Sequence, residues 1–212
     1  MIMKRTMIAL IVFLTAMVCS GGHAADITAT PETYKVIINT VRMWNDTDGQ
    51  WYTASTGDTC FDITAAEVDC SCGCYCTDID LPDGTYTYIE ITMSRTFQIK
   101  SKVDDPLDGF GGGAGKTWYT TTTTTGGDIS CSMDNGNYAL GTAVIQTPAG
   151  WTSTGDYMHK SYKLPASMVI TGETARTVRI NFAVASSVKF TGLSSVIWCV
   201  PKAPDIKITQ VE

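Results

Sequence analysis

Residues 176–184, Arg-Thr-Val-Arg-Ile-Asn-Phe-Ala-Val, alternate apolar and polar side chains more cleanly than any other segment of the chain. Successive side chains of a β-strand point to opposite faces of its sheet, so a period of two indicates a strand. Val178, Ile180, Phe182 and Val184 share one face of this segment. The segment therefore predicts a half-buried strand whose apolar face contacts a core.

Working outward, the same pattern recurs between turn signals along most of the chain. Turns are expected at residues 45–49, 81–84 and 135–136, which are rich in Asn, Asp, Pro and Gly. A change of parity around Asn39 and Thr40 predicts a β-bulge. The further strand-like segments are residues 34–38, 41–44, 50–53, 85–93, 96–100, 138–146, 188–190, 196–198 and 206–208.

This spacing predicts an all-β fold, a β-sandwich of Ig-like or jelly-roll-like type that covers residues 25–212. The glycine-rich segment 106–116 is expected to be a surface loop and a possible internal joint. The threonine run 120–125 is expected to form an edge strand or an exposed loop. The core candidates are Val36, Ile38, Tyr86, Tyr88, Val178, Ile180, Phe182 and Trp198.

The first 24 residues have the features of a secretory signal peptide. Lys4 and Arg5 precede an apolar run at residues 8–18, and small residues follow it up to Ala24. A membrane-spanning helix needs about 20 apolar residues, more than this run provides. We expect cleavage near Ala24 and a freely secreted chain that works extracellularly or at the cell surface. Lipidation of Cys19 is the alternative, although Val18 is larger than the residue such a site normally has before its cysteine.

The charge pattern argues against nucleic acid as a partner. The formal net charge is −6, and the 15 Lys and Arg residues are scattered rather than clustered. Phosphate backbones are bound by clustered positive charge. Since no segment after the leader is long and apolar enough, the sequence also predicts no membrane span.

One short motif carries a resemblance to a known class of domain. Residues 81–91, Leu-Pro-Asp-Gly-Thr-Tyr-Thr-Tyr-Ile-Glu-Ile, resemble the L-P-x-G-x-Y turn and strand of extracellular Ig-like and prealbumin-like domains in bacterial surface proteins. The resemblance covers eleven residues. It implies a β-sandwich and an extracellular setting, and it implies no activity.

The chain has eight cysteines, of which Cys19 lies in the leader. Outside the cytosol thiols oxidise, so we expect most of the other seven to form disulfides, with Cys131 and Cys199 bridging to the region 60–76. An odd number leaves one thiol free or paired between molecules. The alternative is a zinc or copper(I) thiolate cluster at residues 70–76, where every second residue is a cysteine. The seven disulfide candidates are Cys60, Cys70, Cys72, Cys74, Cys76, Cys131 and Cys199.

Other motifs that bind cofactors fit poorly, and no cofactor or catalytic residue is expected. In the segment 108–117 the first glycine of a phosphate-binding loop falls on Phe110. Asp78, Asp80 and Asp83 resemble part of a calcium loop, but the third carboxylate comes one position late. A structural calcium ion near these aspartates is a minor alternative. After the leader, His159 is the only histidine, so the sequence favours a non-enzymatic protein.

Two functional hypotheses remain. The first is a structural subunit of a cell surface or filament, which self-associates by adding a β-strand to a neighbour. Its strand-addition candidates lie in the two tails, at residues 25–31 and 203–211, and are Ile27, Ile206 and Ile208. The tails can instead complete sheets of their own chain, which is the favoured fate of the C-terminal tail. The second hypothesis is a binding module for a glycan or surface partner, with Trp44, Trp51, Tyr52, Trp118, Tyr119 and Trp151 as candidate ligand-facing aromatics.

Overall fold

The computed structural model describes residues 25–64, 80–105, 110, 115–172, 177–193 and 196–211. These residues form fifteen β-strands and one 3₁₀ turn, Asn135–Asn137, without an α-helix. Every strand pairing among them is antiparallel. The predicted all-β fold is therefore confirmed as a sandwich-like or barrel-like class.

The largest sheet has the order β10-β11-β4-β2-β5-β9, and a seventh strand, β3, pairs with β2. β2 is the centre of this sheet because β3 lies along one of its edges, while β5 and then β4 lie along the other. The strands are β2 (Thr33–Asn45), β3 (Gln50–Asp62), β4 (Gly84–Ser94), β5 (Thr96–Lys100), β9 (Gly141–Val144), β10 (Thr152–Thr154) and β11 (Tyr157–Ile170).

Two smaller sheets complete the described fold. A six-stranded sheet has the order β1-β13-β14-β8-β7-β6, and β12 pairs with β15 as a two-stranded ribbon. The strands of the six-stranded sheet are β1 (Ala25–Ala29), β6 (Lys102–Asp105), β7 (Lys116–Thr125), β8 (Asp128–Ser132), β13 (Val188–Leu193) and β14 (Val196–Pro201). The ribbon consists of β12 (Thr177–Ala183) and β15 (Asp205–Val211).

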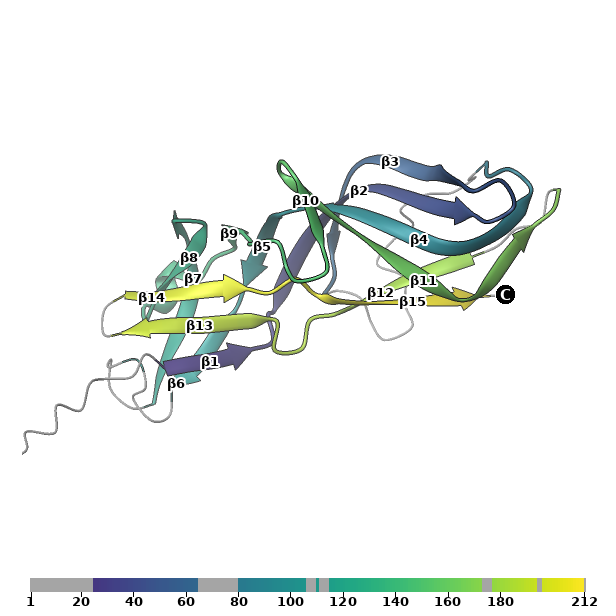
Figure 1. Cartoon of the computed structure of the whole chain (residues 1–212). Coiled ribbons are helices and arrows are strands. Elements are labelled where there is room, and N and C mark those ends of the chain that lie inside the picture. Colours follow the sequence, from purple (N-terminus) through teal and green to yellow (C-terminus); the bar gives the residue numbers. More distant parts are fainter. Residues whose placement is uncertain are drawn as a thin grey trace, which may run out of the picture.

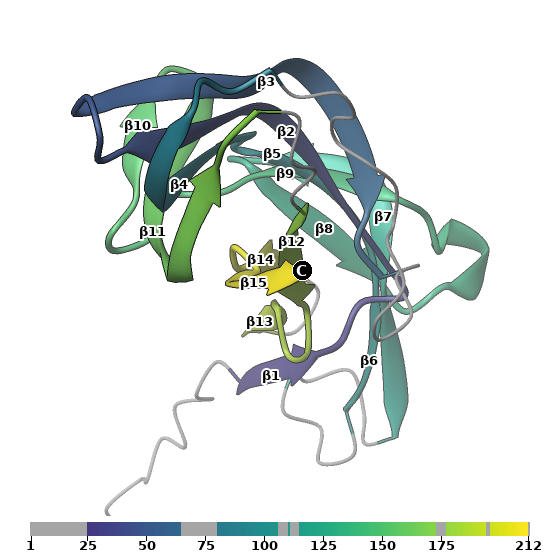
Figure 2. The ribbon, with the colours of Figure 1, turned by 90° about the vertical axis from the view of Figure 1, so that its right-hand side faces the viewer.

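The molecule is elongated (Figure 1). The six-stranded sheet lies towards one end, and β3, β4, β11 and the ribbon lie towards the other. In the view along the long axis, the curved sheet of β3, β2, β4 and β11 arches over the ribbon (Figure 2). This arrangement turns one face of the curved sheet inward and leaves the other face to solvent. No described residue belongs to a helix of the length and apolarity that crossing a bilayer requires.

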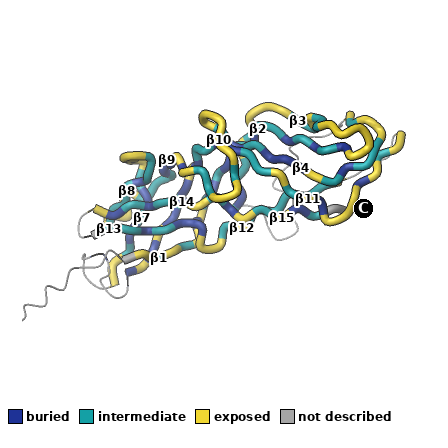
Figure 3. Tube along the Cα trace, viewed as in Figure 1, coloured by how far each residue is buried: buried dark blue, intermediate teal, exposed yellow. Residues whose placement is uncertain are grey.

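The core follows from the alternation along these strands, as the buried and half-buried positions of β2 show (Figure 3). The predicted bulge is confirmed, because the register of β2 against both β3 and β4 shifts between Ile38 and Thr40. The predicted turn at residues 45–49 is confirmed as the hairpin between β2 and β3. The largest fully buried side chains include Tyr34, Tyr86, Ile91, Met93, Phe97, Ile99, Ile129 and Phe190.

The turn before β4 is built from its own residues. The hydroxyl of the fully buried Tyr86 donates a hydrogen bond to the carbonyl of Pro82 at 2.7 Å. Between them Gly84 adopts a positive φ of +157°. A Cβ atom at Gly84 would lie 2.3 Å from the side-chain nitrogen of Asn45, so the backbone approaches Asn45 too closely for any other residue.

Most core candidates are placed as expected, and two are corrected. Tyr86, Val36 and Ile38 are buried, while Val178, Ile180 and Phe182 of β12 are half-buried against the core. Tyr88 is 40% exposed, so its assignment to the core is wrong. Trp44 pairs with Tyr88, and the next residue, Asn45, pairs with Tyr86. Thr87 is therefore an extra residue in β4, a β-bulge, and it reverses which face of the sheet the later side chains of β4 point to. The assignment of Trp198 to the core is also wrong, because Trp198 is only half-buried, whereas Ile197 and Cys199 on either side of it are buried.

The glycine-rich segment 106–116 connects β6 to β7, which are neighbours in one sheet. Within it the described residue Phe110 is buried and packs edge to face on Trp118, with ring centroids 6.0 Å apart. Its backbone N–H donates to Asp105 at 2.8 Å. In the threonine run, Thr120 is buried and residues 122–125 are exposed at the end of β7.

Candidate functional site

Three aromatic side chains lie in cross-strand register on the solvent face of the curved sheet. Trp44 of β2 is opposite Trp51 of β3 on one side and opposite Tyr88 of β4 on the other. Lys163 of β11 extends the register beyond Tyr88. We call Trp51, Trp44 and Tyr88 the aromatic row.

The aromatic row faces outward because the residues next to it in each strand point the other way and pack against the core. Met43 and Ile89 are buried next to Trp44 and Tyr88 in sequence, and Tyr52 packs partly against the core next to Trp51. Adjacent residues of a strand point to opposite faces, so the aromatic row lies on the face away from the core.

The aromatic row forms a shallow, open depression. Trp44 and Trp51 pack edge to face, with ring centroids 5.6 Å apart and an angle of 62° between their planes. The row and Ser161 of β11 line a depression of about 340 Å³. Because the rings are tilted instead of stacked in parallel, they do not hide each other's full faces from a ligand.

A row of polar residues lies directly beside the aromatic row. Arg42 is opposite Glu90 and Thr53, and Glu90 is opposite Ser161. The Nε of Arg42 donates to Oε1 of Glu90 at 2.9 Å, and its Nη2 donates to the same oxygen. Ser161 donates to the other carboxylate oxygen at 3.3 Å. We call Thr53, Arg42, Glu90 and Ser161 the polar row.

Arg42 joins the two rows. Its guanidinium carbon lies 5.5 Å from the ring centroid of Trp51, within the range of a cation–π interaction. The side chain of Glu90 is only 9% exposed, whereas that of Arg42 is 40% exposed. The carboxylate is thus held beneath its cation, and the guanidinium keeps a side toward solvent. The surface combines apolar ring area with oriented polar groups.

The other predicted ligand-facing aromatics lie elsewhere. Tyr52 points to the opposite face of β3 and hydrogen-bonds Asp48, and this hydrogen bond raises the pKa of Tyr52. Trp118 is buried, Tyr119 packs on Tyr138 with centroids 5.1 Å apart, and Trp151 packs on Tyr162 with centroids 6.4 Å apart. Of the six candidates, the structure brings together Trp44 and Trp51.

Sequence reasoning missed Tyr88, although the chain carries a signal for it. Ile89, Ile91 and Met93 share one parity, and Tyr86 has the other. The parity of Ile89, Ile91 and Met93 puts Tyr88 on the opposite face of β4. Tyr86 is nevertheless buried with these three residues, which requires the bulge between Tyr86 and Ile89. With that bulge, Tyr88 falls on the face away from the core.

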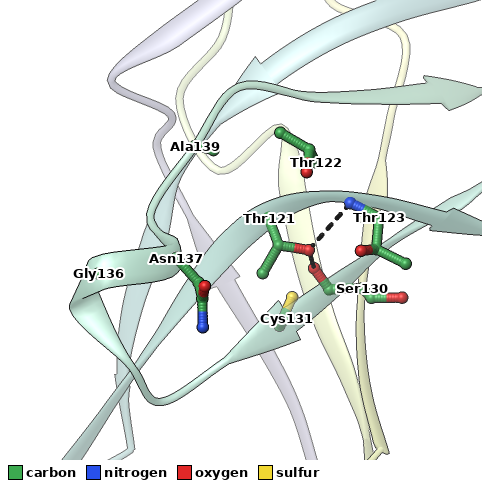
Figure 4. Close-up of a pocket in the computed structure, with 8 residues that line it drawn as sticks. All are labelled: Thr121, Thr122, Thr123, Ser130, Cys131, Gly136, Asn137 and Ala139. Atoms are coloured by element: carbon green, nitrogen blue, oxygen red, sulfur yellow. Dashed lines mark hydrogen bonds between the residues drawn. The ribbon is translucent and has the colours of Figure 1, made fainter.

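A second depression, of about 520 Å³, lies over β7 and β8 (Figure 4). Thr121 donates to the carbonyl of Ser130 at 2.9 Å and accepts from the N–H of Thr123 at 3.1 Å. The lining has hydroxyl, amide and thiol groups and no charged side chain, so it offers no acid–base pair for catalysis. The lining residues are Thr121, Thr122, Thr123, Ser130, Cys131, Gly136, Asn137 and Ala139.

Three of the seven disulfide candidates lie among the described residues. Cys60 is exposed on β3, Cys131 is half-buried on β8 and Cys199 is buried on β14; all three are thiols in this structure. Cys70, Cys72, Cys74, Cys76 and Asp78 lie outside the described residues, so the thiolate cluster, the calcium ion and the bridges to residues 70–76 stay predictions. Among the described residues, no three His, Cys, Asp or Glu side chains are grouped to hold a metal ion.

Both tails pair with strands of their own chain. Ile27 of β1 lies opposite Phe190 of β13. Ile206 and Ile208 of β15 lie opposite Phe182 and Ile180 of β12. These pairings match the alternative in which each tail completes a sheet of its own chain. The addition of a tail to the sheet of a neighbouring subunit stays a prediction.

Comparisons of this chain with protein families, with curated proteins and with solved structures found no match.

Proposed function

We propose that this protein is an extracellular binding module that holds a glycan on the aromatic row. The observation that carries the proposal is the cross-strand register of Trp51, Trp44 and Tyr88 on a solvent-facing sheet surface. The faces of sugar rings carry C–H groups that pack on aromatic rings, and their hydroxyls exchange hydrogen bonds with polar side chains. The two rows present both kinds of group side by side.

The dimensions of the surface favour an extended sugar chain over a small compact ligand. Neighbouring strands lie about 4.8 Å apart, so the aromatic row spans roughly 10 Å across its three strands, about the length of two sugar rings. The depression is shallow and open at its sides, unlike the deep clefts that enclose most small molecules. A chain of sugars can therefore cross the row and continue beyond it toward Lys163.

The polar row supplies the hydrogen-bonding groups that would orient a bound sugar chain. Glu90 accepts hydrogen bonds at both of its oxygens, which leaves the exposed side of Arg42 and the hydroxyls of Ser161 and Thr53 for ligand hydroxyls. A glycosidase uses two carboxyl groups about 5–10 Å apart. The two rows contribute one carboxylate, and it is already paired with a cation. The proposal is therefore binding without hydrolysis.

The proposal is tested by sedimentation of the purified protein with insoluble polysaccharides and by a glycan array. We expect saturable binding to at least one polysaccharide. Tyr88→Ala should weaken it by about tenfold, because loss of one aromatic contact costs on the order of 1.4 kcal/mol. Trp151→Ala is the matched control, since Trp151 packs on Tyr162 away from the row, and it should bind normally. Absence of saturable binding to all sugars tested would contradict the proposal.

A second candidate function is a self-associating surface or filament subunit, and one observation favours it. β1 is the first described strand and stands at one end of the six-stranded order, where it pairs with β13 through residues 25–29. A salt bridge of 3.3 Å joins Lys189 to Asp26. If β1 were exchanged between subunits, every one of these contacts would re-form between two chains, as in domain swapping.

A further inference from the structure

Cys131 and Cys199 lie on neighbouring strands of the six-stranded sheet. Cys199 of β14 is directly opposite Ile129 of β8, and Cys131 follows two residues later on β8. Residues two apart on a strand point to the same face, so both thiols project to the side that carries Ile129. Both contribute to the hydrophobic core, Cys199 fully and Cys131 in part.

The thiol of Cys131 contacts its own strand and interacts with Cys199. Its sulfur lies 3.8 Å from the carbonyl oxygen of Ile129, the residue paired with Cys199. The hydrogen bond with Cys131, together with burial, raises the pKa of the Cys199 thiol well above its usual range. To form a disulfide, the two interacting sulfurs must close to a bond length of about 2 Å.

The two strands meet at the weakest junction of their sheet. Only two residue pairs, Trp198 with Ser130 and Cys199 with Ile129, join β14 to β8. On either side, six pairs join β13 to β14 and four pairs join β7 to β8. A covalent link at this point would hold the two halves of the sheet together where the backbone hydrogen bonds are fewest.

From this geometry we propose that Cys131 and Cys199 form a cross-strand disulfide, made and broken through the threonine-lined depression. Cys131 lines that depression, where its sulfur is drawn among Thr121, Asn137 and Ser130 (Figure 4), whereas Cys199 is completely buried. A reagent from solvent therefore meets Cys131 first. This pairing replaces the expected bridges from these two residues to the region 60–76.

The oxidant is an external disulfide, either a small molecule or the active site of an oxidoreductase. Cys131 loses its proton and its sulfur attacks one sulfur of the reagent; the reagent's S–S bond breaks, and one thiol leaves with that proton. Cys199 then loses its proton to the second leaving thiol as its sulfur displaces the reagent from Cys131. Overall the two protein thiols are oxidised, and one external disulfide is reduced to two thiols.

The test is peptide mapping of the unreduced, alkylated protein by mass spectrometry after treatment with oxidised glutathione. We expect one linked peptide pair that contains Cys131 and Cys199 and disappears on reduction. Cys131→Ser and Cys199→Ser should each remove the link. Cys199 should then be alkylated in Cys131→Ser, whereas Cys131 should carry glutathione as a mixed disulfide in Cys199→Ser. Cys60→Ser, on another sheet, is the matched control and should keep it. Links from either residue to Cys60 or to the cysteines at 70–76, or free thiols at both positions after oxidation, would overturn the proposal.

Two further measurements on the wild-type protein test whether a reagent reaches Cys131 before Cys199 and whether the disulfide stabilises the fold. In the reduced protein a bulky maleimide should label Cys131 at least about tenfold faster than Cys199, because only Cys131 lines the depression. Oxidation should raise the melting temperature by on the order of 10 °C, since the link closes a long loop. Equal labelling rates, or an unchanged melting temperature in a fully linked sample, would contradict these expectations.

Discussion

The indole rings of Trp44 and Trp51 meet edge to face across neighbouring strands, with centroids 5.6 Å apart. The hairpin between them fixes this contact, since Gly49 adopts a left-handed φ of +70° and its N–H donates to the carbonyl of Asn45 at 2.9 Å. The same hairpin binds the start of β4, where the N–H of Asp46 donates to Thr85 at 2.7 Å. Two adjoining turns thus set the register of all three aromatic residues.

Gly84→Ala should disturb this register. The new Cβ would meet the side chain of Asn45, which is buried and accepts a hydrogen bond from the N–H of Thr47. Loss of that bond and overpacking should lower the free energy of unfolding by about 2–4 kcal/mol in urea denaturation. Gly57→Ala is the control, because Gly57 also has a positive φ, of +121°, but nothing lies within 4 Å of its Cβ position. Equal losses in both variants would show that the contact with Asn45 does not matter.

Arg42→Ala should leave the buried carboxylate of Glu90 without its cation. We expect the free energy of unfolding at neutral pH to fall by about 1–3 kcal/mol, less than for a fully buried pair because Arg42 is partly exposed. In the double variant Arg42→Ala with Glu90→Gln, part of this loss should be recovered, since no buried charge remains. Denaturation of both variants provides the comparison; a double variant less stable than the single one would be inconsistent with the ion pair described here.

The protein should unfold in strong alkali as its buried tyrosines ionise. Burial raises the pKa of Tyr162 to about 12 and raises the pKa of Tyr34 further, while an unfolded tyrosine has a pKa of about 10. A raised folded pKa contributes stability that is present below pH 10 and lost as the pH rises through the folded value. Tyrosinate absorbance and far-UV circular dichroism should therefore change together above about pH 11 for these residues. Ionisation of all tyrosines near pH 10 with the β-signal intact would argue against their burial.

The strand-exchange hypothesis predicts that wild-type protein forms concentration-dependent oligomers, and that removal of residues 25–31 abolishes them without unfolding the chain. The reason is that, among the described strands, β1 forms its backbone pairing with β13, and its salt bridge joins Asp26 to Lys189 of that same strand. Charge reversal gives a matched check: Asp26→Lys should weaken assembly, and adding Lys189→Asp should restore it. Analytical ultracentrifugation measures all four proteins. A wild-type chain that stays monomeric at high concentration under oxidising conditions would end this hypothesis.

Features set by neighbouring residues were predictable from the sequence. The hairpin at residues 45–49 follows from its Asn, Asp and Gly content, and the bulge near Asn39 follows from a change of apolar parity within a few residues. The alternation that exposes Trp44 and Trp51 belongs to the same local information. These features place two of the three members of the aromatic row.

Features set by distant pairing were not predictable in the same way. The single extra residue Thr87 moves Tyr88 from the core to the surface, because one inserted residue reverses every later side chain of a strand. The proximity of Cys131 to Cys199 depends on β8 pairing with β14, which are separated by five intervening strands in the chain. No local pattern encodes such a pairing, since it depends on how the whole sheet closes.

The central claim, that a glycan binds to the aromatic row, is tested most directly by the double variant Trp44→Ala with Trp51→Ala on a glycan array, beside the wild type and Trp151→Ala. With circular dichroism confirming that all three are folded, we predict that the double variant loses at least about 100-fold in affinity, since two aromatic contacts contribute roughly 2.8 kcal/mol. Trp151→Ala should bind like the wild type. Undiminished binding by the double variant would contradict the claim.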